Sequence, residues 1–160
     1  MAKKQAVEKT NAMRKLDAMK IPFQEYTYEG DGTLTGVDVA AMLGQNADQV
    51  FKTLVTVGRT GEHYVFMIPV ADELDLKKAA KAAGDKNMEL VAVKELLGLT
   101  GYIRGGCSPV GMKKKYPTFM DETCVLWEEI AVSAGARGHQ LIVPPEPLAE
   151  LVDAKLLDLV

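Results

Sequence analysis

Two neighbouring runs of strongly strand-forming residues constrain the fold of this chain more than any other feature. Val50–Val57 is rich in β-branched and aromatic residues, and His63–Val70 follows it after a turn at positions 59–62. The longest strongly apolar stretch, Tyr64–Ala71, falls far short of the roughly 20 residues that a membrane span needs. The two runs therefore predict a β-hairpin, and no membrane-spanning helix is expected.

The rest of the chain alternates between helix and strand patterns, with Thr35 and Asp75 placed to cap two of the helices. Helices are predicted over Ala6–Met19, Val37–Leu43, Leu76–Ala83, Val93–Leu97 and Pro147–Ala154. Further strands are predicted over Phe23–Tyr28, Met88–Val91, Thr118–Asp121, Glu129–Ser133, Gln140–Val143 and Leu156–Val160. This interleaving predicts an α/β (α+β) fold with a mixed β-sheet surrounded by helices.

Length and composition indicate one ordinary globular domain over residues 1–160. No repeat, linker or low-complexity run divides the 160 residues, of which 48% are apolar. The N-terminus, Met1-Ala2-Lys3-Lys4, lacks the apolar core of a signal peptide, so we expect a cytoplasmic protein. Cys107 and Cys124 have no zinc-type spacing, so two free thiols and no metal or other cofactor are expected.

Charge limits how this chain could bind nucleic acid. The formal net charge is −3, whereas proteins that bind RNA by electrostatics alone normally carry a basic face. Positive charge is concentrated in the basic run Lys113-Lys114-Lys115, with Arg104 just upstream. The run is read either as a solvated surface patch or as a local contact with nucleic acid that a partner protein assists.

Two segments carry candidate chemistry. Lys52 stands among apolar and β-branched neighbours, either as a lysine whose stem covers apolar surface or as a cation aimed at a phosphate or an oxyanion. The second segment, Thr100–Gly111, contains Gly105-Gly106, which let backbone amides approach a ligand, or else form a plain connector.

A nucleophile supplied by the protein has little support. Cys107 or Ser108 would need a base, and the sequence offers only His63 and His139, neither of them in a triad pattern. We therefore interpret Cys107 and Cys124 as packing residues.

The segments Val50–Leu54, Leu76–Lys78, Thr100–Tyr102 and Gly105–Gly111 occur in the order and with the spacing of the YbaK/EbsC family, which this chain resembles over nearly its whole length. These proteins are relatives of the editing domain of bacterial prolyl-tRNA synthetases. The resemblance implies a partly barrel-like mixed-sheet fold and a trans-editing deacylase that removes cysteine from proline tRNA. A binding pocket separates near-isosteres such as cysteine and proline by only about 10–200-fold, so a second site must remove the errors.

The resemblance also assigns roles to residues. Lys52 matches the family's key lysine, and Gly105 and Gly106 match the glycine pair whose amides are expected to hold the aminoacyl group. The substrate's own thiol is expected to attack its ester, so that the enzyme supplies placement and no nucleophile. The residues expected to bind the substrate, the 3′ acceptor end of an aminoacyl-tRNA, are Tyr28, Thr53, Ser108, Pro109 and Gln140.

Two positions depart from the family pattern. Gln140 stands where an aspartate is common, and Thr35 stands where an aromatic residue would be expected. The alternatives that stay open are a deacylase for another small amino acid such as alanine, a catalytically silent tRNA- or nucleotide-binding module, and a hydrolase of small esters. Because the chain is acidic overall, prolyl-tRNA synthetase is the expected partner that presents the tRNA.

Overall fold

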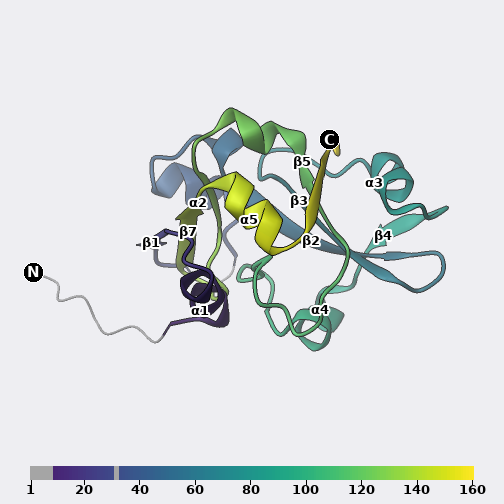
Figure 1. The fold of residues 1–160 in the computed structure, drawn as a ribbon, viewed down its shortest axis with the longest axis horizontal. Coiled ribbons are helices and arrows are strands. Elements are labelled where there is room, and N and C mark those ends of the chain that lie inside the picture. The colour runs from purple at the N-terminus through teal and green to yellow at the C-terminus, as the bar shows by residue number, and fades with distance from the viewer. Residues whose placement is uncertain (1–8, 31–32) are drawn as a thin grey trace, which may run out of the picture.

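The computed structural model describes residues 9–30 and 33–160 as an α/β structure with helices packed around two β-sheets (Figure 1). The helices are α1 (Asn11–Ala18), α2 (Gly36–Met42), α3 (Leu76–Ala83), α4 (Val93–Thr100) and α5 (Pro145–Leu151), with two 3-10 helices, η1 (Ala47–Gln49) and η2 (Glu122–Leu126). The strands are β1 (Gln24–Thr27), β2 (Phe51–Gly58), β3 (His63–Pro69), β4 (Met88–Leu90), β5 (Thr118–Asp121), β6 (Ile130–Ser133), β7 (His139–Val143) and β8 (Ala154–Leu157). The predicted mixed α/β fold is confirmed.

The described strands form a large and a small sheet that meet at one corner. The large sheet has the order β4-β2-β3-β5-β8, in which β2 is antiparallel to β3 and β4, while β5 is parallel to β3 and β8. The small antiparallel sheet has the order β1-β7-β6. A single parallel bridge between Val50 and Ala131 joins the two sheets. The described strands share this corner without closing into a barrel.

Helix ends lie where the capping residues predict them. The Thr35 side chain accepts from the Asp38 N–H at 3.1 Å, and the Asp38 carboxylate accepts from the Thr35 N–H at 3.0 Å, so α2 begins in a reciprocal capping box. At the start of α3 the Asp75 carboxylate accepts from two backbone amides, and Gly84 ends the helix with a φ of +72°. In α1, the part of the prediction that precedes residue 9 lies outside the described residues.

Several predicted boundaries in the C-terminal half were wrong by a few residues. α4 continues through Gly98 to Thr100, because the left-handed C-cap is Gly101 rather than Gly98. α5 begins at Pro145 instead of Pro147, since proline fits the first turn of a helix. It ends at Leu151, after which Asp153 turns the chain with a φ of +55°, and β8 starts two residues earlier than predicted.

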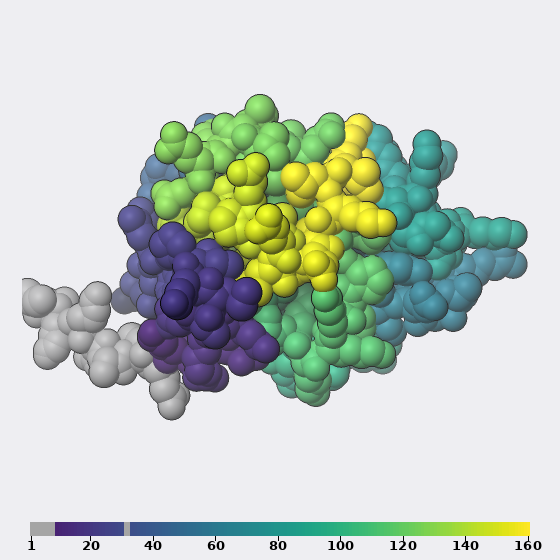
Figure 2. All heavy atoms as spheres, in the orientation of Figure 1, coloured from purple at the N-terminus to yellow at the C-terminus, as the bar shows by residue number. Residues whose placement is uncertain are grey.

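The two faces of the large sheet pack against different layers. Side chains alternate along β2, and its register pairs Lys52 with Ile68 and Thr53 with Met67. The Ile68 face packs on α3, whereas the Met67 face packs on α1, α5 and the small sheet. Figure 2 shows α1 and α5 side by side on the outside of the layer that covers the Met67 face. Lys52 and Thr53 therefore belong to opposite faces of one strand.

Among the described residues, no helix is long and apolar enough to cross a membrane.

Candidate active site at the open edge of β2

A cavity of about 550 Å³ lies along one edge of β2. β4 pairs with β2 only at Thr56–Gly58, so within the described chain no strand covers Lys52–Val55 on that side. The Val55 carbonyl accepts from the Val91 N–H at 3.0 Å on this edge, and strand alternation directs the N–H and C=O of Thr53 the same way. The cavity is therefore walled by an exposed strand backbone together with the segments around α2, α4, Gly105 and β7.

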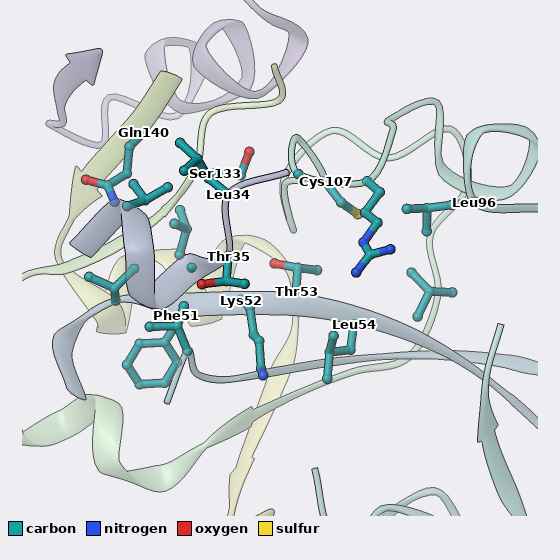
Figure 3. Close-up of a pocket in the computed structure, with 18 of the residues that line it drawn as sticks. Leu34, Thr35, Phe51, Lys52, Thr53, Leu54, Leu96, Cys107, Ser133 and Gln140 are labelled. Atoms are coloured by element: carbon teal, nitrogen blue, oxygen red, sulfur yellow. The ribbon is translucent and has the colours of Figure 1, made fainter. Parts of the chain in front are cut away.

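Thr53 places an unsatisfied hydroxyl on this wall. Its Oγ1 is buried and has no hydrogen-bond partner among the described residues. Figure 3 shows the Thr53 side chain pointing toward Cys107, which also lines the cavity. A buried hydroxyl without a partner costs about 1–3 kcal/mol, and a ligand that hydrogen-bonds to it recovers that cost.

Lys52 lines the same cavity from the other face of the strand. Figure 3 shows its side chain leaving β2 in the direction opposite to Thr53, so its ammonium group points away from Cys107. Within the described residues Lys52 Nζ has no hydrogen bond or ion pair. Its position at an open strand edge leaves this long flexible cation available to a ligand that enters the cavity.

The two glycines of the predicted pair have different structural roles. Gly105 lines the cavity with a φ of +85°, a conformation that favours glycine. Gly106 does not line it: its N–H donates to the Ile103 carbonyl at 2.9 Å, and an added Cβ would lie 3.0 Å from backbone atoms of Ala136 and Arg137. Gly106 therefore lets the turn pack against the β6–β7 hairpin with its N–H already engaged, and contact of the two amides with the aminoacyl group stays a prediction.

Ser108 and Pro109 stiffen the turn and do not line the cavity. The Ser108 hydroxyl is fully buried and accepts from the Val110 N–H at 3.2 Å. The Tyr102 hydroxyl donates to the Val110 carbonyl at 2.6 Å, and burial raises the pKa of this phenol to about 12. Arg137 Nε fastens the turn to the hairpin by donating to the Arg104 carbonyl at 2.8 Å. The structure thus gives Ser108 and Pro109 a positioning role rather than substrate contact.

Tyr28 and Gln140 line the cavity, as predicted for substrate-binding residues. Gln140 is only 3% exposed, and its amide forms a reciprocal pair with Gln45, which follows α2. The Gln140 nitrogen donates to the Gln45 oxygen at 3.1 Å, and the Gln45 nitrogen donates back. This neutral pair closes one end of the cavity and ties α2 to β7.

The electrostatics of the cavity favour an anion. Lys52 and Arg104 both line it, and the described lining residues include no Asp or Glu. The protein as a whole is acidic, with a formal net charge of −3. Positive charge is therefore collected where a phosphate-bearing ligand would enter.

No activated nucleophile faces this cavity from the described residues. Burial raises the pKa of the Cys107 thiol to about 11, so the thiol stays neutral at physiological pH. His139 lines the cavity, but its Nδ1 lies 2.7 Å from the Glu25 carboxylate, and strand alternation places its ring on the face of β7 opposite the Gln140 side chain. His63 packs edge-on against Tyr116. Within the described chain, no group of His, Cys, Asp and Glu is arranged to hold a metal ion.

Sequence reasoning missed part of the wall. Cys107 was interpreted only as a packing residue, and Ser133, Val91 and Leu96 were not considered, although all four line the cavity. The signal for Val91 and Leu96 was the apolar character of the chain from the end of β4 into α4. This segment could not be placed beside the cavity without knowing that β4 pairs with β2.

Comparison with known proteins identifies the family and the fold. A family model described as an aminoacyl-tRNA editing domain matches residues 31–151. The chain is 45% identical over 160 residues to EbsC of Enterococcus faecalis, whose name assigns it as a Cys-tRNA(Pro)/Cys-tRNA(Cys) deacylase, and the match covers 99% of this chain and 98% of that one. It is 30% identical over 105 residues to the proline–tRNA ligase of Shouchella clausii, covering 66% of this chain and 18% of the ligase.

A solved structure described as a trans-editing enzyme for prolyl-tRNA synthetase superposes with a TM-score of 0.79 and 27% sequence identity. The superposition covers 96% of this chain and 98% of that structure. Together with the full-length relative and the family model, this superposition shows that the chain belongs to the aminoacyl-tRNA editing domain family, as its resemblance to YbaK/EbsC proteins predicted.

Proposed function

We propose that this editing enzyme removes cysteine from mischarged proline tRNA. The proposal rests on the family, on the substrates named for EbsC, and on a phosphate-favouring cavity large enough for an aminoacyl nucleoside. The name of EbsC includes cysteinyl-tRNA of the cysteine type, so selectivity for the tRNA body is a separate question.

The proposed reaction uses the thiol of the substrate. The cysteinyl sulfur attacks the ester carbonyl carbon, the bond from that carbon to the ribose oxygen breaks, and the ribose oxygen takes up a proton. The product is a strained four-membered thioester ring, which water opens to free cysteine. Holding two groups of one substrate together can lower a barrier by about 7–11 kcal/mol at best, from which the ring strain subtracts.

The proposal is carried by one observation: the cavity wall has hydrogen-bonding groups without protein partners beside a protein thiol that stays protonated. Thr53 Oγ1 is available to the aminoacyl group, and the Gly105 N–H has no partner among the described residues. Cys107, with its pKa raised to about 11, packs the wall without attacking. Because the Lys52 side chain leaves the opposite face of β2, we assign its ammonium group to the ribose–phosphate side of the substrate.

A deacylation assay tests both the activity and the mechanism. Proline tRNA charged with cysteine, serine, alanine or proline is incubated with the enzyme, and the fraction still charged is measured over time. Serine differs from cysteine by oxygen in place of sulfur, so thiol attack predicts fast loss of cysteine and slow loss of serine. Equal rates for the two would overturn the mechanism, and no acceleration of any substrate would overturn the proposed function.

Lys52→Ala measures the role of the edge lysine, with Lys155→Ala on β8 as the matched control. We expect Lys52→Ala to lower kcat/KM at least about tenfold, as the loss of a charge-assisted contact predicts, and Lys155→Ala to leave it unchanged. Equal activity of the two variants would remove Lys52 from the site.

A second candidate, deacylation of alanyl-tRNA by water, is favoured by the Gln45–Gln140 pair. This pair closes the cavity with neutral amides, where the resemblance to the family leads us to expect an aspartate. Clearance of alanyl-tRNA with cysteinyl-tRNA spared would establish this alternative.

We also propose that a synthetase presents the tRNA. Within the basic run, Lys115 pairs with Asp153 and Lys113 Nζ donates to the Gly98 carbonyl at 3.3 Å, so much of its charge is already engaged. We expect weak, salt-sensitive binding of tRNA by the isolated enzyme and tighter binding with prolyl-tRNA synthetase present. Tight binding by the isolated enzyme that does not change with salt would contradict this.

A further inference from the structure

Large apolar side chains are exposed at the end of β4, on α4 and just after α4. Leu90, Val93, Leu97 and Ile103 are 55%, 56%, 54% and 42% exposed, respectively. Leu90 and Val93 also line the cavity. Exposed apolar side chains at the entrance of a binding site, such as Leu90 and Val93, indicate a ligand that covers them.

The cavity has one closed and one open end. Figure 3 places Gln140 and Leu96 at opposite ends, with Lys52 and Thr53 between them. At the Gln140 end the buried Gln45–Gln140 amide pair forms the wall, so we infer that this end accepts only a small group. At the Leu96 end the wall continues into the exposed side chains of Leu90 and Val93.

A substrate with its ester beside Thr53 must direct its two halves to these two ends. The amino acid is the small half and fits the closed end. The nucleoside is the large half and must leave through the apolar end. Apolar and aromatic walls hold nucleobases by contact with their flat faces, which every base possesses.

We propose that Leu90, Val93 and Leu96 form a subsite for the terminal nucleobase of the aminoacyl-RNA, which is an adenine in every mature tRNA. This inference rests on the proposed function and deepens it, because it says which part of the substrate the open end recognises. Arg104 also lines the cavity, and its guanidinium adds a planar cation that can lie against a base or pair with the adjoining phosphate.

Binding of two stable probes tests the subsite directly. One is adenosine whose 3′ position carries cysteine through an amide, and the other is the same cysteinyl ribose without a base; calorimetry measures both. Base contacts of this kind correspond to about 5- to 150-fold in affinity, so the adenosine probe is expected to bind tighter by a factor in that range.

The double variant Leu90→Ser/Val93→Ser is expected to bring the adenosine probe down to the affinity of the base-free probe, which itself is expected to bind unchanged. The matched control is Leu126→Ser/Val125→Ser on η2, the same residue types with 76% and 54% exposure, far from α4 in Figure 1. This control is expected to retain the preference for the adenosine probe.

Equal affinity of the wild-type enzyme for the two probes would overturn the subsite. So would a double variant that keeps the preference, in which case the apolar surface is a contact for another protein. Deacylation of cysteinyl-tRNA is measured in parallel. Active enzyme without a base preference would refute the subsite alone, whereas a base preference without deacylation would refute the proposed function alone.

Discussion

The substitution Gly106→Ala adds one methyl group and tests whether packing of the glycine turn against the β6–β7 hairpin holds the site in place. An ideal Cβ there would lie 3.0 Å from the Ala136 carbonyl carbon and 3.0 Å from the Arg137 nitrogen. Both are backbone atoms, so the contact is relieved only if the glycine turn moves away from the β6–β7 hairpin. Overpacking typically costs about 1–3 kcal/mol, and replacing glycine by alanine returns about 0.4–1 kcal/mol through the unfolded chain.

We therefore expect Gly106→Ala to lower the free energy of unfolding by about 1–2 kcal/mol. For a protein of this size the melting temperature should fall by about 2–8 °C. Because the same movement displaces Gly105 and Cys107 on the cavity wall, kcat/KM for deacylation should fall at least about tenfold, in line with the sensitivity of catalysis to small misplacements.

The control is Gly98→Ala, at a helical glycine of α4 with no atom within 4 Å of the added Cβ. Alanine is the better helix former by about 1 kcal/mol, so this variant should melt at the same or a higher temperature with unchanged kcat/KM. Thermal melting followed by circular dichroism and the deacylation assay supply both readouts. If Gly106→Ala matches the wild type in both, the close packing of turn and hairpin is not what holds the site.

Three further outcomes are expected. Asp75→Ala should lower the free energy of unfolding by about 1 kcal/mol in a denaturant titration, because it removes the side-chain cap of α3; an unchanged midpoint would contradict this. Gln45→Ala should cost about 1–3 kcal/mol and lower kcat/KM, because it leaves the buried Gln140 amide without its partner; Gln45→Glu, which keeps an acceptor, should cost less. Burial raises the pKa of Cys107 to about 11 from an ordinary 9, so the unfolded chain loses this proton first and stability should fall as pH rises from about 9 to 11; melting curves of Cys107→Ala should show a smaller decline.

The local parts of the fold could be predicted from sequence because each has a local cause. The hairpin of β2 and β3 follows from two strand-forming runs around a turn, and α3 is bounded by Asp75 and Gly84 as predicted. The parallel pairing of β5 with β3 and β8 was not predicted. It joins segments far apart in the chain, whose partners no local pattern specifies.

The site was predicted in its members more than in its geometry. Lys52, Thr53 and Gly105 all line the cavity, and strand alternation puts Lys52 and Thr53 on opposite faces of β2, but the sequence did not show which layer each face meets. The sequence also did not show that the Gly106 N–H donates to the Ile103 carbonyl, because this hydrogen bond depends on how the turn folds back. The sequence therefore indicated which residues line the site, whereas their contacts could be known only from the coordinates.

The unpaired edge of β2 also affects how copies of this protein behave in solution. A bare strand edge invites pairing with another chain, and natural proteins discourage this by placing lysine on such edges. Lys52 stands on the uncovered stretch of β2, so its charge keeps molecules apart as well as meeting the substrate. Exchanging it for an apolar residue removes that repulsion, and preparations of Lys52 variants will self-associate more readily than the parent protein.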